Sequence, residues 1–125
     1  MATKKKAATK KATKKKAVKP VLEIKIKPDG SVPVDSFVDG NGKKHPPKVY
    51  WKATDPAKHY RIVLTTPPAP FKNGSGPFPT GANGETETLT VNKRYANGRY
   101  DYTVELLAAR GKWSPDSGGG IIVDA

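Results

Sequence analysis

The sequence predicts an all-β domain, an antiparallel Greek-key β-sandwich, over residues 21–125 of the 125-residue chain. Seven or eight short segments alternate apolar and polar residues, which is the period of half-buried strands. Clusters of Gly, Pro, Asn and Asp separate these segments at intervals of roughly ten residues, as in β-sandwiches. The segment 98–106 is the clearest strand among them, and we expect the rest of the domain to cover its apolar face.

That segment has one apolar and one polar face. Its inward side is formed by Tyr100, Tyr102, Val104 and Leu106. Charged residues and a threonine alternate with them, so the strand is expected to be half-buried and central in the sandwich. Asn97-Gly98 predicts a tight turn at its start, with Tyr95 on the far side of that turn.

Two strands are expected before residue 40. The first spans residues 21–27, and its inward residues are Leu22, Ile24 and Ile26. Residues 28–30 read Pro-Asp-Gly and predict a turn. The second strand spans residues 32–38 and is interrupted by Pro33, which suits an edge strand because proline cannot donate to a sheet ladder.

The segment 48–53 carries aromatic side chains on both faces and is expected to be a central strand. Trp51 has two interpretations. It can stack on a nucleic-acid base beside neighbouring lysines, but a tryptophan between strand signals is more often a core residue, and we expect the core. After a turn at residues 54–57, the next strand spans residues 59–65, with Tyr60, Ile62 and Leu64 inward.

Residues 66–84 form a Pro/Gly-rich stretch without a strand pattern. Long loops of this kind are often functional, and Pro67-Pro68-Ala69-Pro70 fits a polyproline ligand for a protein partner. The plainer interpretation is a crossover loop that closes one end of the sandwich, with Phe71 and Phe78 as its apolar plugs. We favour that interpretation and keep a protein partner at 66–84 as an alternative.

The C-terminal third completes the sandwich. Residues 85–91 predict a strand with Leu89 and Val91 inward, and residues 107–110 a short helical turn. Residues 114–120 are interpreted as a Gly-rich loop before a terminal apolar strand, 121–123.

The first twenty residues differ sharply in composition from this domain. They contain almost only Ala, Thr and Lys, and nine lysines precede the first acidic residue, Glu23. These lysines are Lys4, Lys5, Lys6, Lys10, Lys11, Lys14, Lys15, Lys16 and Lys19. The whole chain has a net charge of +12, so residues 20–125 carry +12 − 9 = +3. Residues 1–20 are therefore expected to be a disordered basic tail.

Such a tail resembles the Lys/Ala/Thr/Pro tails of linker histones and of bacterial histone-like proteins. Its lysines are expected to bind nucleic-acid phosphates as mobile point charges, without reading sequence. Another polyanion, an anionic membrane surface and a purely solubilising role are the alternatives. No aromatic or Leu anchor supports membrane binding, and Ala2 stands where myristoylation requires glycine.

Several chemistries are excluded by the residues present. The chain has no cysteine, which removes thiolate metal sites, disulfides and thiol nucleophiles. His45 and His59 lie outside any motif, and nothing near Glu85 and Glu87 would separate their pKa values for acid–base work. Residues 118–120 lack the Lys-Ser/Thr of a phosphate loop. We therefore expect no catalytic residues, no metal and no cofactor.

The domain also resembles the second half of a cupredoxin. The resemblance rests on Val49-Tyr50-Trp51, His59-Tyr60-Arg61-Ile62-Val63, Gly98-Arg99-Tyr100-Asp101-Tyr102-Thr103-Val104 and the closing Gly-Gly-Ile-Ile-Val-Asp. It implies a cupredoxin- or immunoglobulin-like sandwich. His59 matches the family's first copper ligand, but Val104 falls on or near the thiolate position and no His or Met follows before Gly120. The resemblance thus implies the fold and argues against a copper site.

Together these features predict a non-enzymatic nucleic-acid-binding protein. The tail contacts the backbone, with DNA favoured over RNA, and the sandwich mediates a further interaction. The alternative is a protein-interaction or structural module whose basic tail is a solubility element or a polyanion tether. No apolar stretch is long enough to span a membrane, and we expect a cytoplasmic protein, associated with the nucleoid in a bacterium.

Overall fold

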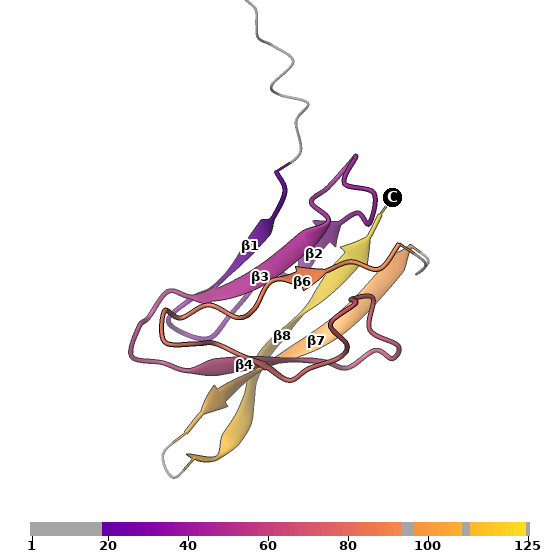
Figure 1. Ribbon diagram of the computed structural model, residues 1–125. Coiled ribbons are helices and arrows are strands. Elements are labelled where there is room, and N and C mark those ends of the chain that lie inside the picture. Colours follow the sequence, from indigo (N-terminus) through magenta and orange to yellow (C-terminus); the bar gives the residue numbers. More distant parts are fainter. Residues whose placement is uncertain (1–18, 94–96, 109–110, 125) are drawn as a thin grey trace, which may run out of the picture.

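A computed structural model describes residues 19–93, 97–108 and 111–124 (Figure 1). The strands in these ranges are β1 (Leu22–Ile26), β2 (Asp35–Val38), β3 (Lys48–Ala53), β4 (Tyr60–Leu64), β5 (Phe78–Pro79), β6 (Leu89–Thr90), β7 (Gly98–Leu107) and β8 (Trp113–Val123). No α-helix occurs in the described residues. The all-β prediction is confirmed.

The strands form two sheets. The small sheet has the order β1-β3-β6, and the large sheet has the order β2-β8-β7-β4-β5. The chain crosses between the sheets several times, and the two layers enclose one core, so the predicted β-sandwich is confirmed (Figure 1).

Strand pairing is mixed where the sequence predicted antiparallel pairing. β1 pairs with β3 in parallel, and so does β2 with β8. β2 lies between β1 and β3 in the chain but belongs to the other sheet. The chain therefore returns from β1 to β3 by a crossover, which brings the two strands into the same direction; a hairpin would have reversed it.

The core lies between β3 and β7, each central in its sheet as predicted. Trp51 is fully buried, and Tyr102 is 2% exposed. Their rings meet edge to face at 5.1 Å between centroids. The other inward residues of β1, β3, β4 and β7 follow the expected alternation, although Tyr100 and Leu106 are only half-buried.

The predicted loop at residues 114–120 is wrong, because β8 is a continuous strand from Trp113 to Val123. It pairs with β7 as a long hairpin that extends beyond the other strands (Figure 1). Its glycines are required by neighbouring side chains. A Cβ atom at Gly119 would lie 2.7 Å from the Tyr102 hydroxyl oxygen, and one at Gly120 would lie 2.4 Å from Cζ of Arg99. Large side chains of β7 fill this space, so glycine here marks close packing and not a loop.

Smaller differences concern the other connections. The predicted strand 85–91 reduces to β6, with Glu85 in an isolated bridge to Lys52. The loop 66–84 contributes the short edge strand β5, and Phe71 and Phe78 are buried as expected. β2 is an edge strand as predicted. Residues 1–18 of the expected tail, Tyr95 and residues 109–110 of the predicted helical turn lie outside the described residues, and Leu107 belongs to β7.

Candidate nucleic-acid interface

The predicted phosphate-binding lysines belong almost entirely to residues that the structure does not describe. Lys19 is described and exposed just before β1. The other eight, Lys4, Lys5, Lys6, Lys10, Lys11, Lys14, Lys15 and Lys16, lie outside the described residues. The structure therefore shows the domain to which these lysines are attached, and it includes Lys19 but none of the other eight.

The loop between β2 and β3 is organised by a buried carboxylate. Asp39 is fully buried, directly after β2. Its side chain accepts hydrogen bonds from the backbone N–H groups of Asn41 at 2.8 Å, Lys43 at 3.0 Å and Lys44 at 2.8 Å. A backbone bond from Gly42 N to the Asp39 carbonyl, at 2.9 Å, closes the turn. One side chain thus fixes the backbone from which two lysines project.

These contacts determine the protonation of Asp39. Burial of the carboxyl raises its pKa, while the three N–H donors and the nearby His45 lower it. The second group of effects is larger, so the pKa of Asp39 lies below its ordinary value. The carboxylate is ionised at neutral pH, and its negative charge is directed at the three backbone N–H groups of the loop.

The end of the loop contacts the C-terminal strand. His45 Nε2 lies 3.1 Å from Oδ2 of Asp124, and the Lys44 ammonium lies 3.9 Å from the other oxygen. The His45 ring also packs against Phe37 of β2, with centroids 5.3 Å apart. His45 is therefore a structural residue of this loop.

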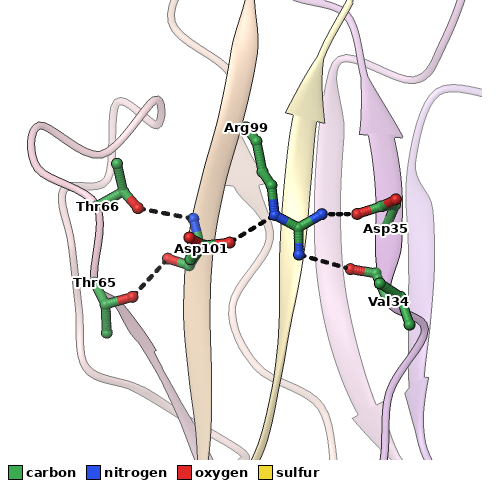
Figure 2. Close-up of polar contacts among 6 residues, drawn as sticks. All are labelled: Val34, Asp35, Thr65, Thr66, Arg99 and Asp101. Atoms are coloured by element: carbon green, nitrogen blue, oxygen red, sulfur yellow. Dashed lines mark hydrogen bonds and ion pairs between the residues drawn. The ribbon is translucent and has the colours of Figure 1, made fainter.

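On the outer face of the large sheet, one arginine crosses three strands (Figure 2). Arg99 of β7 donates from Nε to Asp101 at 2.7 Å, contacts Asp35 of β2 through a second nitrogen, and reaches the Val34 carbonyl at 3.3 Å. Its side chain passes over β8 at Gly120, where no side chain obstructs it. All three nitrogens of the guanidinium are engaged within the protein.

A second arginine on this face is engaged in the same way. Arg61 of β4 donates to Glu105 of β7 at 2.5 Å, and its guanidinium lies 4.6 Å from the ring centroid of Trp113. Arg61 and Arg99 are the arginines of the described residues, and both are paired with carboxylates. The outer face of the large sheet thus offers little unpaired positive charge.

The small sheet carries a different set of charges. Tyr50 of β3 donates to Glu23 of β1 at 2.5 Å, and Lys52 lies 3.7 Å from Glu85. The hydrogen bond to Glu23 is the main cause that raises the pKa of Tyr50 to about 12. Several exposed lysines make no ion pair within the described part of the chain: Lys19, Lys25, Lys27, Lys43, Lys48, Lys72, Lys93 and Lys112.

The remaining predicted positions are structural. Trp51 is a core residue, as expected, and His59 is an exposed residue just before β4. Glu87 accepts a hydrogen bond from Asn73 at 2.9 Å and does not pair with Glu85. Val104, at the position of the cupredoxin thiolate, is fully buried in the core.

Neither a metal centre nor a cleft was found in the described ranges. No group of three His, Asp or Glu side chains among residues 19–93, 97–108 and 111–124 is placed to hold a metal ion. The same residues form no pocket and contain no helix that could cross a membrane.

Comparisons of the chain with family models, curated proteins and solved structures found no match. The candidate interface therefore rests on the residues themselves. Sequence reasoning missed the Asp39 loop and the pairing of both arginines, because each depends on contacts between distant segments. The local signal is Asp39-Gly40-Asn41-Gly42, a composition typical of a turn, which does not show that Asp39 anchors a lysine-bearing loop.

Proposed function

We propose that the chain is a non-enzymatic nucleic-acid-binding protein whose N-terminal lysines contact phosphates without sequence specificity. The observation that carries this proposal is the run of nine lysines before the first acidic residue. DNA is favoured over RNA as the partner, and in a bacterium such a protein would belong to the nucleoid.

The physical basis is counterion release. Each lysine that neutralises a duplex phosphate releases condensed cations, which gives a slope of about −0.9 in log affinity against log salt per contact. Nineteen residues extend at most about 60–70 Å, enough to follow a duplex over more than one turn. A lysine ammonium lacks the planar fork that reads base edges, so the binding carries no sequence preference.

The sandwich would supply a further interaction. Val34 is 71% exposed and Phe37 is 44% exposed, and both lie at the edge strand β2. Exposed apolar residues beside a sheet edge favour contact with a protein. The loop 66–84 is a weaker alternative, because Ala69, Pro70 and Phe71 are buried in the domain and only the rest of the loop is available to a partner.

We also infer that the domain is a cupredoxin-like sandwich without the copper site. The two-sheet arrangement and the central Gly-x-Tyr-x-Tyr strand support the likeness. The buried Val104 and the exposed His59 support the loss of the site. Titration with Cu(II) should give no intense visible charge-transfer band. A one-to-one site abolished by His59→Ala would overturn this inference.

The main test is a fluorescence anisotropy series on two unrelated duplexes from about 50 to 300 mM salt. The full chain should give a slope between about −4 and −8, since the nine tail lysines contribute at most about −8 and are not all expected to engage. A chain with its nine tail lysines replaced by glutamine should give about zero to −2, and a tail scrambled at fixed composition should bind like the original. Equal slopes for the native and lysine-free tails would contradict the proposal.

A further inference from the structure

Three exposed lysines lie on or beside one short segment of the domain, residues 90–93. Lys48 of β3 pairs with Thr90 of β6, and the backbone N–H of Lys72 donates to the Thr90 carbonyl at 2.8 Å from the other side. Lys93 ends the segment. We call Lys48, Lys72 and Lys93 the lysine cluster, and none of them makes an ion pair within the described part of the chain.

The Asp39 loop packs against the same segment. A Cβ atom at Gly40 would lie only 3.1 Å from Cα of Lys93, and Val91 N donates to the Pro47 carbonyl at 2.9 Å. The loop therefore brings Lys43 to the border of the cluster on a backbone that Asp39 holds in place.

The basic tail joins the domain at this end. β1 runs parallel to β3 with Leu22 opposite Val49, which places Val21 beside Lys48 and Lys19 just beyond it. Figure 1 shows the start of β1, the loop between β2 and β3 and the C-terminus gathered at one end of the sandwich. Residues 1–18 precede Lys19 in the chain, so the chain enters the described domain beside the cluster.

Carboxylates at this end do not neutralise the cluster. Asp39 is buried against three N–H groups, and Asp124 faces Lys44 and His45. Glu87, exposed just before β6, accepts a hydrogen bond from Asn73 and keeps its charge, so this one carboxylate is outnumbered by the three lysines. Local positive charge therefore remains in excess.

At the opposite end of the sandwich, positive and negative charges lie together. Lys27, Lys58 and Lys112 lie there with the carboxylates of Asp29, Asp55 and Asp116. Burial first, and then these three carboxylates, raise the pKa of Tyr60 at the start of β4. The three lysines and three carboxylates named here balance one another within the described residues, which makes this end less attractive to a polyanion.

We propose that the lysine cluster is a second, fixed phosphate-contact surface, so that a duplex bound by the tail also lies against this end of the sandwich. The inference rests on the proposed function of the tail and adds a defined position for the domain on the duplex. Adjacent strands lie about 4.8 Å apart, which puts Lys48 and Lys72, on either side of β6, about 10 Å apart. Flexible lysine stems let these ammonium groups reach phosphates of one backbone.

The test uses the full chain and two variants of equal charge. The cluster variant is Lys48→Gln/Lys72→Gln/Lys93→Gln, and the control is Lys27→Gln/Lys58→Gln/Lys112→Gln at the opposite end. The cluster variant should reduce the magnitude of the salt slope by about 1 to 2, which corresponds to the removal of one or two phosphate-bound lysines at about 0.9 each. The control should change it by less than about 0.5.

The outcomes separate this inference from the proposed function. Equal slopes for the cluster and control variants would overturn the cluster as a contact surface while the tail could still bind. A lysine-free tail that leaves the native slope unchanged would instead overturn the proposed function. Binding to vesicles of anionic and of neutral phospholipid is measured as well. If the cluster variant loses binding to the anionic vesicles but binds the duplex as the native chain does, the cluster contacts membranes and the inference is overturned. Unchanged melting temperatures confirm that both variants are folded.

Discussion

The contact between Tyr102 and Trp51 gives the sharpest test of the sandwich. Tyr102 is 2% exposed in the middle strand of the large sheet, and its ring lies edge to face on Trp51 of the small sheet. Tyr102→Ala would remove the side chain that joins the two central strands. The expected loss of unfolding free energy is about 3–5 kcal/mol, the range for truncating a buried aromatic residue.

Tyr102→Phe separates the ring from its hydroxyl. The hydroxyl oxygen is buried, and neither it nor Nε1 of Trp51 makes a hydrogen bond of normal geometry with the described residues. Burial raises the pKa of Tyr102, and the Trp51 side chain lowers it by a smaller amount, so any contact between the two groups is weak. A buried polar group without a partner costs about 1–3 kcal/mol, so its removal should offset the weaker van der Waals packing around the missing oxygen atom. We expect Tyr102→Phe to be as stable as the native chain or more stable by up to about 1 kcal/mol.

Urea unfolding followed by tryptophan fluorescence measures both effects. With an m-value of about 1–3 kcal/mol/M, Tyr102→Ala should lower the midpoint by at least about 1 M. Phe37→Ala is the control, because this 44% exposed side chain should cost under about 1 kcal/mol. A loss below about 1 kcal/mol for Tyr102→Ala would refute the placement of this face in the core. A loss above about 1.5 kcal/mol for Tyr102→Phe would show that the hydroxyl is hydrogen-bonded after all.

Three further outcomes follow from single contacts. Gly119→Ala should cost about 1–3 kcal/mol, because its Cβ would lie 2.7 Å from the Pro33 carbonyl oxygen, whereas Gly81→Ala, with its nearest contact at 3.6 Å, should be tolerated in the same urea assay. Asp39→Asn should lose about 1–3 kcal/mol near pH 7. The folded-state pKa of Asp39 lies below its unfolded value, so its contribution is present above that value and is lost as pH falls through the folded one. The difference between Asp39→Asn and the native chain should therefore narrow below about pH 4, and a gap constant across pH would contradict the ionised carboxylate. Glu23→Gln should lower the pKa of Tyr50 from about 12 towards its ordinary value in an alkaline absorbance titration, and an unchanged value would show that Glu23 is not its partner.

Period-two patterns predicted most of the strands because alternation is a local consequence of burying one face. Residues 98–106 and 48–53 show this, since both became the central strands of their sheets. The pattern failed at residues 114–120, where glycine replaces the expected apolar residues. There the space is filled by Tyr102 and Arg99 from the neighbouring strand, and no local sequence signal reports a side chain that arrives from elsewhere.

The same limit applies to the candidate interface. The nine lysines that precede the first acidic residue can be read directly from the sequence, and so can the net charge of the rest of the chain. Which lysines remain unpaired is a property of the fold. Lys48 and Lys93 are 45 positions apart in the chain, and they come together because β3 and β6 are neighbours in the small sheet.

The pairing of the arginines gives a physical reason for the proposed lack of sequence preference. Arginine is the side chain best suited to read guanine edges, because its planar fork donates two parallel hydrogen bonds. Arg61 and Arg99 are both held by carboxylates of the large sheet, and Arg94 and Arg110 lie outside the described residues. The cations left unpaired in the described domain are lysines, which interact with phosphates as point charges. If the chain binds a duplex as proposed, the described part of the domain offers lysines for the phosphates and no unpaired arginine to distinguish one base pair from another.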